Sequence, residues 1–206
     1  MPAIITPIPC GMIQANTYLV QAEGREDCAV IDPGDDYPKL KRALAGRRVG
    51  AILLTHGHFD HIQAAGLMAA ESGAPVYAAA EDMEMLNDPR LNGFLDLMGV
   101  SRRTWQEIQA QPYGEALSVC GLDFQVLPTP GHSKGSVCLY LKDEAALFSG
   151  DTLFRGGYGR MDLYGGDSRA LLDSLKRLFA LPPGVAVYPG HGGATTIGEE
   201  RARYRL

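Results

Sequence analysis

The sequence predicts a single α/β domain in which strands and helices alternate along the chain. Apolar runs of strand length recur between turns rich in glycine and proline, and several are followed by stretches with helical spacing of apolar residues. A chain of 206 residues, 46% of them hydrophobic, can bury about 70% of its unfolded surface in one core. We therefore expect residues 1–206 to form one domain.

The first half of the chain is expected to hold four strands and two helices. The strands are predicted at 17–21, 28–31, 51–54 and 75–79, and the helices at 37–45 and 62–72. Asp60 and His61 are expected to begin the second helix, just after the turn that leaves strand 51–54.

Residues 81–112 depart from this alternation and predict a helical insertion. Two or three helices are expected there, with Ser101 as an N-cap and with Phe94, Met98 and Trp105 among the apolar positions.

The second half of the chain returns to the strand pattern. Three further strands are expected between residues 115 and 148, and a last one at 185–188. Asp167 is a predicted N-cap for a leucine-rich amphipathic helix that Pro182-Pro183 would end.

All five histidines lie in three short, glycine-flanked segments. These are Thr55-His56-Gly57-His58-Phe59-Asp60-His61, Gly131-His132-Ser133 and Pro189-Gly190-His191-Gly192, and Asp151 lies between the last two in Ser149-Gly150-Asp151-Thr152. Imidazole and carboxylate groups are typical ligands of first-row metal ions. Seven such groups in motifs of this kind would suffice for two metal sites.

The spacing indicates how these groups could meet. In an extended stretch, His56 and His58 point to the same side. Asp60 and His61, at the start of a helix, point elsewhere, so one segment can serve two adjacent metal ions. The other candidate ligands each follow a strand-like apolar run: His132, Asp151 and His191.

The ligand type favours a catalytic site over a structural one. A lone histidine is usually a surface or core residue, but none of the histidines lies outside these motifs. Closed structural zinc sites usually contain cysteine, whereas three histidines with an open fourth position suit catalysis.

The motifs resemble those of the metallo-β-lactamase superfamily over nearly the whole chain. The HxHxDH pattern at 56–61, followed by His132, Asp151 and His191 in that order, carries the resemblance. The segments Gly150-Asp151-Thr152-Leu153-Phe154 and Gly156-Gly157-Tyr158-Gly159-Arg160 are similar to the glyoxalase II, or hydroxyacylglutathione hydrolase, branch. The resemblance implies a four-layer αββα sandwich: two mixed sheets packed face to face, with helices outside.

The resemblance also implies which residues bind each metal ion. The first ion would be held by His56, His58 and His132, the second by Asp60, His61 and His191, and Asp151 would bridge both. Asp60 and Asp151 are accordingly the predicted catalytic carboxylates. We expect two Zn²⁺ per chain, although iron or manganese accept the same ligands.

The predicted chemistry is hydrolysis by a metal-bridging hydroxide. Two metal ions can lower the pKa of a shared water from about 16 toward about 7. The hydroxide would attack the acyl carbonyl of a small thioester or ester, and a metal ion would stabilise the leaving group. Since the family places variable segments over the metals, residues 81–112 are expected to form a lid; the alternative is that they only dock on the sandwich.

The alternatives to this hydrolysis are the reactions of other members of the superfamily. A mononuclear-iron persulfide dioxygenase would keep most of these histidines and is the main one; a lactonase or a β-lactamase are minor ones. His58 stands where di-iron redox members have a glutamate. The β-lactamase branches do not use a bridging aspartate, so Asp151 favours the glyoxalase II-like branch.

Two further residues have predicted roles. Arg160 lies where the glyoxalase II branch has a basic residue and could bind a substrate carboxylate; the alternative is a salt bridge to Asp162 or Asp167. Asp32, in Ile31-Asp32-Pro33-Gly34, is expected to hydrogen-bond a ligand imidazole; the alternative is an ordinary turn.

The resemblance to glyoxalase II is weaker in the parts that bind glutathione. The sequence ends 15 residues after His191, so the helical C-terminal domain of glyoxalase II is expected to be absent. Asp162 and Gly193 stand where that branch has tyrosines.

Composition argues against other partners. The net charge is −5, without a basic run, so no nucleic acid is expected. Because the chain has neither an apolar stretch of about 18 residues nor a signal-peptide pattern, no membrane association is expected. The four separated cysteines suggest free thiols and a cytoplasmic location. The expected partner is a small molecule.

Overall fold

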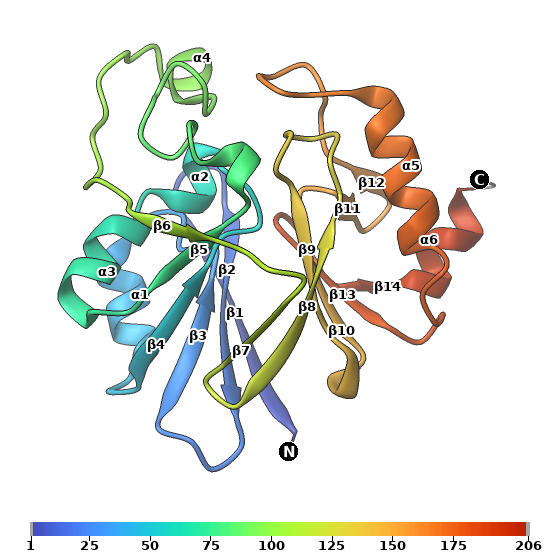
Figure 1. Ribbon diagram of the computed structural model, residues 1–206, viewed down its shortest axis with the longest axis horizontal. Helices are drawn as coiled ribbons and strands as arrows, with labels where there is room; N and C mark the ends of the chain where they lie inside the picture. The colour runs from blue at the N-terminus through green and yellow to red at the C-terminus, as the bar shows by residue number, and fades with distance from the viewer. Residues whose placement is uncertain (1, 205–206) are drawn as a thin grey trace.

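The computed structural model describes residues 2–204 and forms two six-stranded sheets packed face to face (Figure 1). Helices cover the outer face of each sheet, which confirms the αββα sandwich. Met1 and the chain end at 205–206 lie outside the described residues. None of the helices in residues 2–204 combines the length and apolar character that crossing a membrane requires.

The first sheet is built from the N-terminal half of the chain. It contains β1 (Ala3–Cys10), β2 (Ala15–Ala22), β3 (Asp27–Ile31), β4 (Arg48–Leu53), β5 (Val76–Ala78) and β6 (Ala110–Pro112) in that spatial order. The first three strands are antiparallel and the last four run parallel, so the sheet is mixed. Its helices are α1 (Tyr37–Leu44), α2 (Phe59–Ile62) and α3 (Ala65–Ser72).

The second sheet is built from the C-terminal half. Its strands are β7 (Ala116–Val119), β8 (Leu122–Pro128), β9 (Val137–Leu141), β10 (Ala146–Gly150), β13 (Ala186–Pro189) and β14 (Thr195–Thr196), in the order β14-β13-β10-β9-β8-β7. Only β10 and β13 are parallel. Helices α5 (Ser168–Leu178) and α6 (Ile197–Arg203) cover this sheet, and the hairpin β11 (Leu153–Phe154) and β12 (Gly157–Tyr158) lies beside it.

Strands in the middle of the sandwich are apolar on both faces because each face meets a different layer. In β3, Cys28 and Val30 belong to the core beneath the helices of the first sheet. Ala29 and Ile31, one position along, belong to the core between the two sheets. This arrangement explains why β3 is fully buried and shows no alternation of polar and apolar residues.

Several predicted elements differ in the structure. Strand β1 was not predicted because Pro7 and Pro9 argue against a central strand; it lies at the sheet edge, where proline is tolerated. The region expected to hold three strands contains four, β7 to β10; β7 has only four residues, all at least partly exposed. Strand β14 and helix α6 were also not predicted.

The predicted helix at 62–72 is interrupted. The chain forms α2, then a turn, then α3, because the amide of Ala64 donates to the carbonyls of Pro33 and Gly34 at 3.0 and 3.2 Å. A Cβ on Gly34 would lie 1.8 Å from the carbonyl oxygen of Asp60, so this close approach requires glycine. The prediction that Asp167 caps α5 is confirmed: its carboxylate accepts from the amides of Arg169 and Ala170.

The helical content predicted for residues 81–112 is wrong. The segment holds the end of the 3₁₀ turn η1 (Ala80–Asp82), one short helix, α4 (Phe94–Met98), and β6; the rest is turn and loop. Ser101 caps no helix, because residues 102–109 are loop up to β6; before it, Gly99 ends α4 in a left-handed conformation with φ of 68°. Phe94 and Trp105 are buried: the ring of Phe94 lies 5.3 Å from that of Phe59 and 5.3 Å from that of Trp105.

Phe148 is the expected stability determinant between the sheets. It is fully buried, and its ring lies 5.2 Å from that of Tyr18 and 5.3 Å from that of Tyr188. We expect Phe148→Ala to lower the free energy of unfolding by about 3 to 5 kcal/mol, the usual cost of such a cavity. Chemical denaturation of the metal-free protein checks this. Leu172→Ala, on the solvent side of α5, should change the free energy of unfolding by less than about 0.5 kcal/mol. Equal losses in both variants would contradict the prediction.

Candidate metal centre

The predicted ligands converge at one end of the sandwich, where strands of both sheets end. His56 and His58 lie in the loop after β4, and His61 lies on α2. The second sheet supplies the others from the ends of three strands: His132 after β8, Asp151 after β10 and His191 after β13. The structure thus brings His132, Asp151 and His191 next to the segment 56–61.

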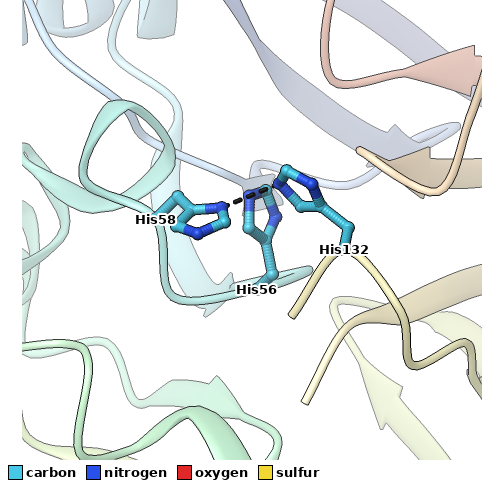
Figure 2. A group of neighbouring side chains, drawn as sticks. All are labelled: His56, His58 and His132. Atoms are coloured by element: carbon cyan, nitrogen blue, oxygen red, sulfur yellow. Dashed lines mark hydrogen bonds between the residues drawn. The ribbon is translucent and has the colours of Figure 1, made fainter. Parts of the chain in front are cut away.

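His56, His58 and His132 form the first cluster (Figure 2). One ring nitrogen from each lies within 4.8 Å of the others. The closest pair is Nδ1 of His58 and Nε2 of His132, at 2.7 Å. All three side chains are buried, so they form a compact nitrogen-only site.

Asp60, His61 and His191 form the second cluster. Nε2 of His191 lies 3.2 Å from Oδ2 of Asp60 and 3.3 Å from Nε2 of His61. The side chain of His191 is 25% exposed, whereas that of His61 is fully buried. The second cluster therefore faces the solvent more than the first.

Asp151 lies between the two clusters. Its Oδ1 is 3.4 Å from Nε2 of His61, and its Oδ2 is 3.5 Å from Nε2 of His132 and 3.6 Å from Nε2 of His191. A single carboxylate thus reaches ligand atoms of both clusters, which is the position a bridging group needs. Gly190 makes room for it, because a Cβ there would lie 2.1 Å from Oδ1 of Asp151.

Three buried ligand atoms have no hydrogen-bond partner in residues 2–204. They are Nε2 of His56, Nε2 of His58 and Oδ1 of Asp151. Leaving such atoms unpaired is costly, and buried polar atoms in native proteins nearly always have a partner. Nitrogen and carboxylate donors oriented toward one another fit a divalent metal ion.

The other ring nitrogens are held by hydrogen bonds that orient the imidazoles. Nδ1 of His132 donates to the carbonyl of Arg160 at 2.7 Å, and Nδ1 of His61 pairs with Oδ2 of Asp32 at 3.0 Å. Nδ1 of His56 lies 3.0 Å from the hydroxyl of Thr55. Each contact leaves the Nε2 atom directed into the centre, an arrangement common around protein metal sites.

Asp32 takes the place expected from the sequence. Besides His61, its carboxylate accepts the amide of Thr55 at 2.7 Å and the hydroxyl of Thr55 at 2.6 Å. Although Asp32 also lies near His56 and His61 as a third group of candidate ligands, its oxygens already have these donors. Its geometry suits an orienting role better than direct metal binding.

The electrostatics differ between the two clusters. Burial lowers the pKa of His58 to about 3 and that of His56 well below its usual range, so both are neutral at pH 7. Burial acts in the same direction on His61, but the carboxylates of Asp60 and Asp151 outweigh it and raise its pKa well above the usual range. His61 is therefore protonated without a metal ion.

A cavity of about 370 Å³ opens onto both clusters. Its wall includes His58, Asp60, Asp151 and His191, together with apolar side chains from the β1–β2 turn and from α4 such as Ile13 and Leu97. Asn92 and Gly93 also line it, so part of the segment 81–112 borders the centre. The closure of this segment over the centre stays a prediction.

Arg160 also lines the cavity, but its guanidinium already has a partner. Nε and Nη2 donate to the two carboxylate oxygens of Asp162 at 2.7 and 2.8 Å, the alternative considered from the sequence. These hydrogen bonds lower the pKa of Asp162 to about 2. Both side chains are more than half exposed, so a substrate carboxylate could compete for the guanidinium.

Two residues that sequence analysis missed hold the His191 loop. The side-chain amide of Asn16 donates to the carbonyls of Pro189 and Gly192, and the hydroxyl of Tyr18 donates to the carbonyl of Pro189 at 2.6 Å. The sequence offers little signal for either residue, since β2 (ANTYLVQA) also contains Thr17 and Gln21 and the burial of Asn16 is visible only in the structure.

Comparison with known proteins agrees with this geometry. The model of the Metallo-beta-lactamase superfamily matches residues 10–191. BLEG-1 B3 metallo-beta-lactamase is 38% identical, with a TM-score of 0.89 over 97% of both chains. TTHA1623, solved in a di-iron-bound form, is 40% identical, with a TM-score of 0.85 over 96% of this chain and 97% of that one.

A named enzyme is also similar over most of its length. The hydroxyacylglutathione hydrolase GloC of Haemophilus influenzae is 31% identical over 208 residues, which cover 94% of this chain and 93% of GloC. The superfamily that the histidine motifs resemble is thus the one that the fold and the relatives share. The chain belongs to the metallo-beta-lactamase superfamily and, within it, to the metal-dependent hydrolases.

Proposed function

We propose that the protein is a binuclear metal-dependent hydrolase of a small thioester or ester, similar in chemistry to hydroxyacylglutathione hydrolases. The observation that carries this proposal is the position of Asp151 between two ligand clusters, where three buried side-chain atoms have no hydrogen-bond partner in residues 2–204. We assign the first ion to His56, His58 and His132, and the second to Asp60, His61 and His191. Zinc is the proposed metal for these ligands.

Bound metal ions in such a centre make hydroxide available at neutral pH and polarise a carbonyl oxygen. The residues of the chain have their own tasks. Asp151 would hold the two sites at one separation, and Asp60 would accept a proton at its free carboxylate oxygen as the tetrahedral centre forms. The apolar side chains Ile13 and Leu97 would exclude water from the acyl group.

The relatives support different parts of this proposal. GloC supports hydrolysis of an acyl thioester, since it carries that activity in its name and aligns over nearly its whole length. The structure of TTHA1623 contains two iron ions, which supports a binuclear centre and makes iron the first alternative to zinc. BLEG-1 is named a B3 metallo-beta-lactamase, so β-lactam hydrolysis is the second candidate function.

A substrate panel on protein of known metal content tests the proposal. The panel contains S-lactoylglutathione, acyl thioesters without glutathione, a lactone, a β-lactam and glutathione persulfide. We expect two metal ions per chain and fastest turnover of a thioester. Faster β-lactam turnover would favour the second candidate. A single iron with oxygen consumption on the persulfide would instead establish a dioxygenase and overturn the proposal.

The ion pair of Arg160 leads to a prediction about substrate charge. Asp162→Asn should free the guanidinium, so the KM of a thioester with a carboxylate on its thiol portion should fall about fivefold, or about 1 kcal/mol, while kcat changes little. Steady-state kinetics check this, with an uncharged thioester of the same acyl group as the control. An equal fall in KM for both substrates would contradict the assignment of Arg160 to substrate binding.

A further inference from the structure

Asp82 is a buried carboxylate outside the predicted ligand set. It lies at the end of η1, and its side chain is fully buried. Its Oδ2 atom accepts the amide of Gly57 at 2.9 Å and the hydroxyl of Ser133 at 2.6 Å, and its Oδ1 atom accepts the amide of Gly135 at 2.6 Å. Three donors from two loops therefore converge on one carboxylate.

These donors are neighbours of the first cluster of ligands. Gly57 lies between His56 and His58, and Ser133 directly follows His132. The first loop leaves β4 in the N-terminal sheet, and the second connects β8 to β9 in the C-terminal sheet. Asp82 thus joins the two sheets at the place where the three histidines meet, without touching a histidine itself.

The fit around the carboxylate is close. A Cβ on Gly135 would lie 2.7 Å from Cγ of Asp82, and a Cβ on Gly57 would lie 3.4 Å from Cβ of Asp82. No lysine or arginine in residues 2–204 pairs with Asp82, and burial raises the pKa of its carboxyl. A buried carboxylate without a cation is costly to the fold, so a compensating role is expected.

Asp32 has a related but different position. It contacts His61 directly, in the second cluster, whereas Asp82 accepts hydrogen bonds from Gly57, Ser133 and Gly135, which are neighbours of the first cluster. We propose that Asp82 is a positioning residue for the first metal ion, which holds the His56 and His58 loop and the His132 loop at the separation that binding requires. The inference rests on the proposed metal centre but not on any substrate.

Zinc binding to Asp82→Ala tests the proposal. The metal-free protein is titrated with zinc in the presence of a competing chelator, and both dissociation constants are measured. We expect the first site to weaken about 10- to 100-fold, as for other residues that orient ligands, and the second site to keep its affinity. Asp82→Asn should weaken the first site less, since one oxygen can still accept from Gly57 and Ser133.

Asp27→Asn is the matched control. Asp27 is also a buried carboxylate that joins chain segments, but it pairs with Arg25 and Arg48 at the start of β3, away from the metal centre. Both sites should keep their affinity in this variant. Thermal unfolding of all metal-free variants separates loss of fold from loss of metal.

Ligand variants identify which site is affected. Asp82→Ala should add little to His58→Ala, because both impair the first site. Combined with His191→Ala, it should leave a chain in which both sites bind zinc more weakly than in the unchanged protein. If Asp82→Ala does not fold, Asp82→Asn and Ser133→Ala provide the same comparison.

Two results would overturn the inference: unchanged zinc affinity at both sites, or equal weakening of both sites together with a lower metal-free melting temperature. The second result would mean that Asp82 only stabilises the fold. Because zinc binding is the readout, this inference and the proposed function can fail separately. If Asp82→Ala weakens the first site but the unchanged protein hydrolyses no thioester, only the proposed function is contradicted.

Discussion

Replacing Asp151 by asparagine is expected to lower kcat/KM by about 10³-fold or more, equivalent to about 4 kcal/mol of transition-state stabilisation. The carboxylate lies within 3.6 Å of Nε2 atoms in both clusters, so its charge acts on both proposed sites. The amide keeps the shape of the side chain but removes that charge and offers one oxygen instead of two. Metal content should fall from two ions per chain toward one.

Kinetics on the preferred thioester and metal analysis of the same sample check this prediction. Asp143→Asn is a suitable control, since Asp143 lies in the exposed turn η2 (Lys142–Glu144) before the same strand, β10, and the change in charge is identical. The control should behave as the unchanged protein. Full activity and two metal ions in Asp151→Asn would instead show that the reaction needs no bridging carboxylate.

Removing the metal ions is expected to have the largest effect on stability. At free zinc about 1,000-fold above the dissociation constant, each site adds about 4 kcal/mol to the free energy of unfolding. For a chain of 206 residues, 1 kcal/mol corresponds to about 2 to 4 °C in melting temperature. Complete chelation should therefore lower the melting temperature by about 15 to 30 °C and abolish hydrolysis.

The pKa shifts of the histidines predict the direction in which zinc affinity changes with pH, and calorimetry can check it. His56 and His58 are already neutral at pH 7, so they release no proton when zinc binds. His61 is protonated in the metal-free protein and must release about one proton, which makes zinc affinity rise with pH. Titration in buffers of different ionisation enthalpy measures this release at the second site. Zinc affinity independent of pH near 7 would contradict the raised pKa of His61 in the metal-free protein.

The candidate metal ligands could be named from the sequence because they lie in short segments that resemble the motifs of the superfamily. A histidine or aspartate directly after an apolar strand can only lie at a strand end, and strand ends of two packed sheets meet. Asp82 could not be predicted in this way. In the sequence, Glu81-Asp82 resembles an exposed acidic pair, and only the approach of residues 57, 133 and 135 makes it a buried acceptor.

The secondary structure was least predictable where local pattern and tertiary contacts disagree. The helical periodicity of residues 62–72 continues through Ala64, yet the turn at Pro33-Gly34 takes its amide and divides the helix. In the segment 81–112, Phe94 and Trp105 are spaced as on one helix, but Phe94 lies on the five-residue helix α4 and Trp105 lies in a loop. Neither contact leaves a trace in the local sequence.

The proposed ligands are divided between the two sheets: His56, His58, Asp60 and His61 belong to the first half of the chain, and His132, Asp151 and His191 to the second. Each metal ion would therefore fasten one sheet to the other across the seam between them. Separating the sheets would require both ions to leave first. The lifetime of the folded protein would then be limited by the rate of metal release, so that kinetic resistance to unfolding and to proteolysis becomes a property of the ions rather than of the apolar core.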